Sequence, residues 1–207
     1  MRPVLLALAM MAASASLLAL PAQRAAAKAK AKAPRTSTTA QCAAELGTGA
    51  ASARRFCDVI LGSTPVDSIA ITIPAHRGAA KLLFDLHNRI AVPPGGGQPA
   101  QVFARTTAII AVIGPKGEIS RGVVESEYRK PSDLFDRIAG GPGGAVRTVA
   151  PGPPTPLDIT IPAGVTAIGI VGIRLEVLNR LGEQTYDTPG RPIAIASNIR
   201  VEYTPLR

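Results

Sequence analysis

The residues best suited to chemistry form a short polar series, Asp85, His87 and Arg89, spaced two apart. In an extended strand, residues two apart lie on the same face, so the Asp85 carboxylate and the His87 imidazole can lie side by side. A histidine beside a carboxylate can act as a general base or as a weak metal ligand. The same series also fits a polar ladder on an exposed sheet with no chemical role. Both interpretations stay open here.

Other catalytic arrangements find little support. The chain has no G-x-S-x-G nucleophile motif. His76 falls in a predicted turn, where we expect it to be solvated. Glu125 and Glu127 share a strand face and come nearest to a pair of glycosidase carboxylates, but a chain with no Trp, three Tyr and four Phe has few rings to stack on sugars. The sequence favours a non-catalytic protein, with a hydrolase built on His87 and Asp85 as the alternative.

Metal and cofactor sites are not expected. Two histidines, His76 and His87, and two cysteines are too few and too scattered for a zinc site. The glycine cluster at 93–98 lacks the Lys-Ser/Thr pair that contacts phosphate in nucleotide-binding loops. We therefore predict no metal and no cofactor.

The two cysteines, Cys42 and Cys57, predict a disulfide. An even cysteine count indicates a bridge in a chain that meets an oxidising compartment, and this one would close a loop of about 15 residues. Two buried thiols or a metal pair are the alternatives.

The first 27 residues resemble a cleavable secretory signal. Arg2 is followed by an apolar run, Val4–Leu20, and by small residues at Ala25–Ala27. A basic start, an apolar core and a small-residue end define such signals. The run is also near the lower length limit for a membrane anchor, which leaves retention of the segment open. After cleavage we predict no membrane span and a periplasmic or extracellular location.

Residues 28–40 predict a flexible basic linker, because they alternate Lys with Ala and then become rich in Ser and Thr. Six basic residues lie in the leader and linker, and the rest of the chain holds 17 basic against 14 acidic residues. With most of its net positive charge outside the predicted domain, the chain is not expected to bind nucleic acid. A tether to anionic envelope components through Lys28–Arg35 is an alternative role.

Residues 41–207 predict a single all-β domain, a two-sheet β-sandwich of immunoglobulin-like or jelly-roll-like type. Short runs of Val, Ile and Thr alternate with Gly and Pro clusters. The clearest hairpin joins Thr106–Ile113 to Glu118–Tyr128. Two exceptions are expected: a small helical or irregular segment at 41–57 and a short helix near 132–139. Pro93–Gln98 and Gly140–Pro156 predict loops.

An internal pseudo-repeat supports the sandwich. The pentapeptide at 71–75, ITIPA, recurs at 159–163, and each copy is followed by a long amphipathic strand that ends in Asn-Arg. Alternation places Leu82, Phe84 and Leu86 on the inner face of the first long strand. In the second it places Val171, Ile173, Leu175 and Val177 there. Two such halves packed face to face would form the sandwich.

These observations together predict an exported, non-catalytic binding or structural protein of the bacterial cell envelope. Its partner would be a protein or another envelope component. The binding surface is expected at the two predicted loops, at an exposed apolar patch or at an unpaired sheet edge.

Overall fold

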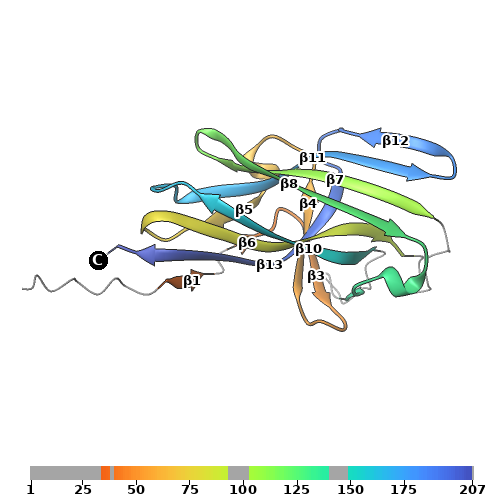
Figure 1. The fold of residues 1–207 in the computed structure, drawn as a ribbon, viewed down its shortest axis with the longest axis horizontal. Helices are drawn as coiled ribbons and strands as arrows, with labels where there is room; N and C mark the ends of the chain where they lie inside the picture. Colours follow the sequence, from red (N-terminus) through yellow and green to blue (C-terminus); the bar gives the residue numbers. More distant parts are fainter. Residues whose placement is uncertain (1–33, 38–39, 93–102, 140–148, 207) are drawn as a thin grey trace, which may run out of the picture. The chain divides into compact units, whose positions relative to one another are not determined.

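The computed structural model describes residues 34–37, 40–92, 103–139 and 149–206. These residues belong to one compact unit, Lys32–Arg207. It is built almost wholly of β-strands in two antiparallel sheets that pack against each other (Figure 1). The predicted two-sheet β-sandwich is confirmed.

The sheets differ in size. The first sheet contains β10 (Val149–Ile161), β6 (His76–Ala91), β13 (Pro192–Pro205), β4 (Arg55–Ile60), β3 (Glu45–Gly49) and β9 (Ile138–Ala139) in this order, and β1 (Arg35–Ser37) also pairs with β13. The second contains β2 (Ala40–Gln41), β5 (Ile69–Thr72), β11 (Ala167–Asn179), β7 (Ala104–Gly114) and β8 (Gly117–Tyr128), and β12 (Gly182–Tyr186) pairs with β11. Two 3-10 turns complete the described structure, η1 (Pro65–Asp67) and η3 (Pro131–Asp133).

The main core lies between the sheets. Leu82, Phe84 and Leu86 of β6 point into it and are fully buried, as the alternation predicts. β7, the predicted central strand, pairs with β11 on one side and with β8 on the other. The predicted hairpin is the β7–β8 pair, which closes where Gly114 pairs with Gly117.

The inward residues of β11 are only partly as predicted, because the strand contains a β-bulge. The register of β11 against β7 shifts between Gly172 and Arg174. One extra residue reverses the alternation, so Ile173 is 36% exposed instead of facing the core. Leu175 and Val177 pack on the main core as predicted. Val171 is buried but lies outside that core, and Ile168 and Ile170 face inward in its place.

The two ITIPA segments occupy reciprocal positions. The first lies in and just after β5, and the second lies at the end of β10. β5 pairs with β11, whereas β10 pairs with β6, so each ITIPA strand pairs with the long strand that follows the other copy. The isoleucines of both segments lie in the main core (Ile71, Ile73, Ile159 and Ile161). The two copies of the sequence repeat therefore make equivalent strand pairings in the fold.

The predicted helical or irregular segment at 41–57 is wrong in its main part. The segment contains β3 and the start of β4, which form a hairpin, and β4 also pairs with β13. The disulfide between Cys42 and Cys57 is present and holds the start of this segment against β4. Pairing with a strand far along the chain overrides the weak local preference of an Ala-rich sequence.

The predicted helix near 132–139 is also wrong. Only one 3-10 turn forms, at Pro131–Asp133, and the chain then runs extended into β9. The Phe135 N–H donates to the Pro151 carbonyl 2.9 Å away, and the Asp136 carboxylate accepts hydrogen bonds from the β3–β4 turn. These tertiary bonds replace those that a helix would have made.

Asp136 holds the β3–β4 turn in place. Its carboxylate accepts hydrogen bonds from the backbone N–H groups of Ala51 and Ser52 and from the Ser52 hydroxyl, at 2.5–3.0 Å. Burial raises the pKa of Asp136, but the bonds from Ser52 and Ala51 outweigh it and hold that pKa below its ordinary value. The group therefore stays ionised and stabilises the turn at neutral pH.

We expect Asp136→Ala to lower the free energy of unfolding by about 1–3 kcal/mol, because it removes the acceptor of three backbone N–H groups and one hydroxyl. Urea unfolding at neutral pH measures the change. Asp158→Ala is the matched control, since Asp158 makes an exposed ion pair with Lys81, and exposed pairs contribute little to stability. Equal losses in the two variants would contradict the assignment.

The structure also modifies the predicted loops and linker. Val149–Pro156 is the first part of strand β10 and not a loop, and its prolines are tolerated because β10 lies at the edge of its sheet. Pro93–Gln98 and residues 140–148 lie outside the described residues. The predicted linker at 28–40 overlaps β1 and β2, and its other residues, apart from Pro34, are not described.

The predicted signal, residues 1–27, lies outside the described residues. Within the described ranges, no helix is long and apolar enough to cross a membrane.

Candidate functional site

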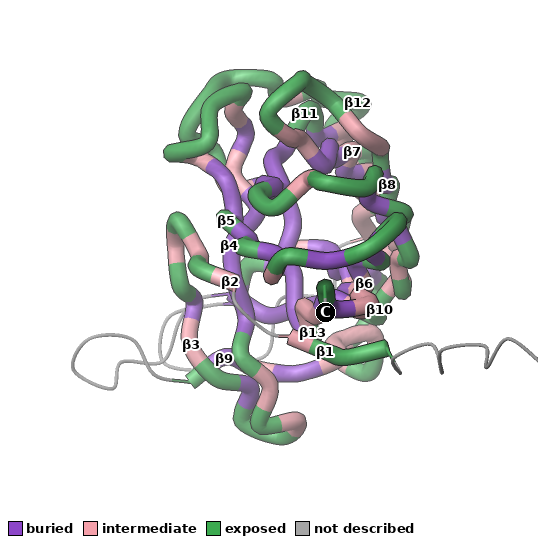
Figure 2. The backbone as a smooth tube through the Cα atoms, turned by 90° about the vertical axis from the view of Figure 1, so that its left-hand side faces the viewer, coloured by how far each residue is buried: buried purple, intermediate pink, exposed green. Residues whose placement is uncertain are grey.

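A second, smaller core covers part of the outer face of the first sheet. Its buried members come from five strands, and Phe135 packs on them from the extended segment before β9. They are Leu46, Phe56, Ile138, Val149 and Ile195. Figure 2 shows buried backbone close to β9, away from the interior between the two sheets. The predicted exposed polar ladder on β6 is therefore covered where it passes under this core.

His87 lies fully buried in that region. Its ring packs edge-on against Phe56, with centroids 5.6 Å apart, and lies 5.2 Å from the ring of Phe135. The ring nitrogen Nδ1 is 2.9 Å from the Gly152 carbonyl oxygen, and Nε2 is 2.8 Å from the Ser197 hydroxyl. Because a carbonyl can only accept, Nδ1 carries the proton and donates it, and Nε2 of the neutral ring accepts from Ser197.

The surroundings of His87 favour its neutral form. Burial lowers the pKa of His87 below the ordinary value of 6.5, and the positive charge of Arg54 acts in the same direction. The Gly152 hydrogen bond and the Asp85 carboxylate oppose this shift without reversing it. The imidazole is thus a neutral, doubly hydrogen-bonded part of the fold at physiological pH.

We expect the stability of the protein to fall as the pH drops below about 6.5, because the unfolded chain binds a proton that the native His87 resists. The slope should not exceed about 1.4 kcal/mol per pH unit for this one group. Urea unfolding between about pH 8 and about pH 5 measures it, with His87→Gln expected to reduce the slope and His76→Gln as the matched control. An unchanged slope in His87→Gln would contradict the prediction.

Asp85 and Arg89 do not join His87 in one site. Asp85 accepts from the Arg54 guanidinium at 2.7 Å and lies 3.4 Å from the Asn198 amide nitrogen. Arg89 reaches across β13 to Asp58 on β4, with Nε 2.9 Å from Oδ1. The three residues share a strand face as predicted, but each is bound to a different partner.

Sequence analysis did not identify Ser197, the residue whose hydroxyl is hydrogen-bonded to His87. It lies 110 residues from His87 along the chain, on β13, which pairs directly with β6. Its only sequence signal is a serine in an isoleucine-rich strand, which is too common to single it out.

The direction of the Ser197–His87 hydrogen bond is that of a serine nucleophile and its base. The Gly152 carbonyl stands where a catalytic triad has a carboxylate. Access excludes this use in the observed conformation: Ser197 is 1% exposed and His87 is 0% exposed, so no substrate carbonyl can approach the hydroxyl. The pair can act here only as a buried polar link between β6, β10 and β13.

The other candidate groups have structural partners. His76 was predicted to be solvated in a turn, which is wrong: it begins β6, is buried, and its Nδ1 lies 2.9 Å from the Pro74 carbonyl oxygen. Hydrogen bonds from Arg129 and Arg105 lower the pKa of Glu127, so this carboxyl is ill-suited to act as a general acid. Glu125 accepts from the Thr107 hydroxyl. Among the described residues, no three His, Cys, Asp or Glu side chains gather as metal ligands.

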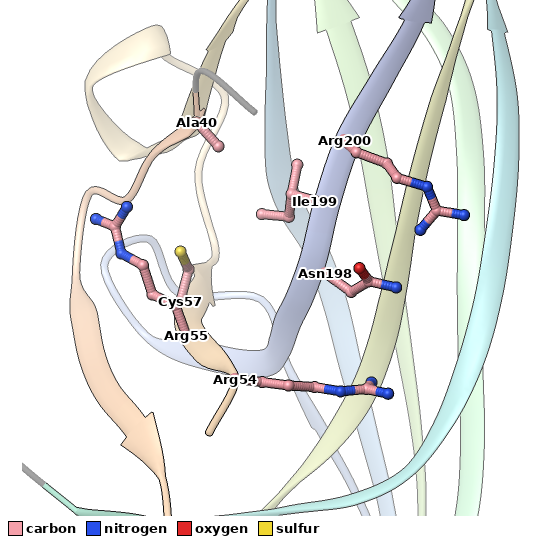
Figure 3. A pocket seen from close by; sticks show the side chains of 7 residues that line it. All are labelled: Ala40, Arg54, Arg55, Cys57, Asn198, Ile199 and Arg200. Atoms are coloured by element: carbon pink, nitrogen blue, oxygen red, sulfur yellow. The ribbon is translucent and has the colours of Figure 1, made fainter. Parts of the chain in front are cut away.

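An open hollow beside β4 and β13 contains three arginines, but they do not form an anion site. It is lined by Ala40, Arg54, Arg55, Cys57, Asn198, Ile199 and Arg200. Figure 3 shows the Arg55 side chain directed away from those of Arg54 and Arg200. Arg55 is bound to Glu45, and Arg54 is bound to Asp85. The guanidinium groups therefore do not converge on one point.

Comparison with known proteins adds no functional assignment. No protein-family model, curated protein or solved structure matches this chain.

Proposed function

We propose that this chain is an exported protein of the bacterial cell envelope whose β-sandwich acts as a non-catalytic binding or structural module. The proposal rests on the observation that the hydrogen-bonded His87–Ser197 pair is buried, so that no substrate can reach it. Among the described residues, the His87–Ser197 pair has the hydrogen-bond direction of a catalytic dyad, but both members are buried and they join three strands. The described residues form a scaffold held together by two cores and a disulfide.

Two features support export. The leader of residues 1–27 has the basic start, apolar core and small-residue end of a secretory signal. The Cys42–Cys57 disulfide also fits export, because disulfides form and persist mainly in oxidising compartments outside the cytoplasm. The two features lie in different parts of the chain, so they support export independently.

The non-catalytic part of the proposal is tested with a serine-directed fluorophosphonate probe. The native protein is expected to give no more labelling than the Ser197→Ala variant, because the probe cannot reach the hydroxyl. Labelling of the native protein that Ser197→Ala abolishes would overturn this part and establish the hydrolase.

Export is tested by expressing the full chain in a Gram-negative host and isolating the envelope fraction. The expected product begins at Lys28 by mass spectrometry and resists thiol alkylation until it is reduced. A chain that lacks residues 1–27 is the control and should stay in the cytoplasm with both thiols reactive. Uncleaved, cytoplasmic full-length protein would overturn the location.

A further inference from the structure

The outer edge of β8 has the properties of a self-pairing surface. β8 lies at the end of the second sheet, and among the described strands it pairs only with β7. Its last nine residues, 120–128, pair with β7 without a register shift. A long, regular strand with one unpaired edge presents a row of backbone N–H and C=O groups that another strand can bind.

The other long edge strand, β10, is protected against the addition of another strand, and β8 lacks that protection. β10 carries four prolines and a register shift between Pro151 and Pro154. Proline removes backbone donors and bulges twist an edge away, and both features block strand addition. β8 contains no proline along 117–128, and its one register shift lies near its start. Of these two described edges, only that of β8 lacks the prolines and the central register shift that block strand addition.

We propose that two copies of this protein pair antiparallel along β8, with Val123 of one copy opposite Val123 of the other, to form a symmetric dimer with a continuous second sheet. A two-fold interface uses the same surface on both copies, so this strand must be complementary to itself. The proposal goes beyond the envelope role and holds wherever the chain resides.

The charges on the outer face of β8 determine this register. Pairing centred on Val123 places Arg121 of each copy opposite Glu125 of the other, which gives two opposite-charge pairs. Arg121 and Glu125 are both exposed. Arg121 also binds Glu118 of its own strand, but this ion pair is exposed and therefore weak, so the guanidinium can turn to Glu125 of the other copy. Glu125 accepts a hydrogen bond from Thr107 but makes no ion pair within the described part of the chain. Directly opposed unlike charges stabilise strand pairing, and like charges destabilise it.

The neighbouring registers of the β8–β8 pairing oppose less compatible side chains. Centring on Glu125 opposes two like carboxylates. A pairing centred on Val124 places the apolar Val123 opposite the charged Glu125. It also places Arg121 opposite Glu127, which Arg105 and Arg129 already bind. A pairing centred on Gly122 places the charged Arg121 opposite the apolar Val123. Among these registers, only the one centred on Val123 matches both charge and polarity.

The apolar residues support the same register. Val123 is 47% exposed, and its partner on β7 is Ile109, which is half-buried. Pairing at Val123 joins the two Val123–Ile109 pairs into one apolar row that crosses the new sheet. Such a row removes apolar surface from water, which stabilises the dimer.

Site-directed crosslinking tests the contact directly. Opposed Cα atoms in an antiparallel pair lie about 4.5–5.5 Å apart, within the range that a disulfide bridges. We expect Val123→Cys to form a covalent dimer under mild oxidation, while Val66→Cys, at a residue that is 85% exposed on another segment, remains monomeric. Crosslinking of Val123→Cys no faster than that of Val66→Cys would overturn the proposal.

Charge reversal tests the register. Arg121→Glu and Glu125→Arg each turn two attractive pairs into two repulsive ones, so sedimentation should show each variant dimerising at least about tenfold more weakly than the wild-type protein. Circular dichroism spectra that match the wild-type spectrum confirm that both variants fold. The Arg121→Glu/Glu125→Arg double variant restores opposite charges and should dimerise as the wild-type protein does.

Mixing gives the sharpest outcome. Arg121→Glu and Glu125→Arg chains are complementary to each other at both positions, so an equimolar mixture should form heterodimers at a concentration where each variant alone is mostly monomeric. A wild-type protein that is monomeric up to millimolar concentration, or single variants that dimerise like wild type, would overturn the proposal.

Discussion

Replacing Phe56 with alanine is expected to lower the free energy of unfolding by about 3–5 kcal/mol, the usual cost of removing a buried aromatic ring. Phe56 is fully buried, belongs to the second core and packs edge-on against the His87 ring. Its loss leaves a cavity beside the imidazole and weakens the cover that keeps Ser197 from solvent. Urea or guanidinium unfolding followed by circular dichroism measures the change.

Leu181→Ala is the matched control for Phe56→Ala. Leu181 is among the most exposed apolar residues described, so its truncation should change stability by less than about 0.5 kcal/mol. A Phe56→Ala variant as stable as Leu181→Ala would mean that the outer face of the first sheet is not covered, and the structural role assigned to His87 would fail with it.

Reducing the disulfide between Cys42 and Cys57 is expected to lower the free energy of unfolding by about 3 kcal/mol, as the chain-entropy model gives for a loop of this length. The bridge joins residues 15 apart, and Cys57 also packs in the main core. Thermal unfolding with and without reductant measures the loss.

The Cys42→Ser/Cys57→Ser variant provides the control, since reductant should not alter its unfolding. Its stability should also lie near that of the reduced wild-type protein. A wild-type protein whose melting temperature is insensitive to reductant would show that the bridge does not constrain the unfolded chain.

The sandwich was predictable because its signal is local. Alternation along β6 identifies Leu82, Phe84 and Leu86 as core residues, and Gly-Pro-Lys-Gly marks the β7–β8 turn. Each of these signals resides within a few consecutive residues.

The errors arise where distant contacts decide the structure. The 41–57 segment becomes a hairpin because β4 pairs with β13, and 134–137 stays extended because Phe135 and Asp136 bond to other segments. The exposed ladder on β6 was wrong at His87 because alternation tells which residues share a face but not whether a second layer covers that face.

The candidate site shows the same limit of sequence analysis, because its hydrogen-bond partners come from distant parts of the chain. The spacing of Asp85, His87 and Arg89 correctly places them on one face. It does not show that Arg54, Ser197 and Asp58 bind them separately. A hydrogen bond between residues 110 apart depends on the order of strands in the sheet, which periodicity does not determine.

The most direct test of the account is the protonation state of His87, followed by side-chain nitrogen NMR in a His76→Gln background that leaves one histidine. We predict a neutral ring with the proton on Nδ1, slow exchange of that proton with solvent, and no titration near pH 6.5. A rapidly exchanging ring that titrates at the ordinary histidine value would contradict the sealed second core and reopen the case for catalysis.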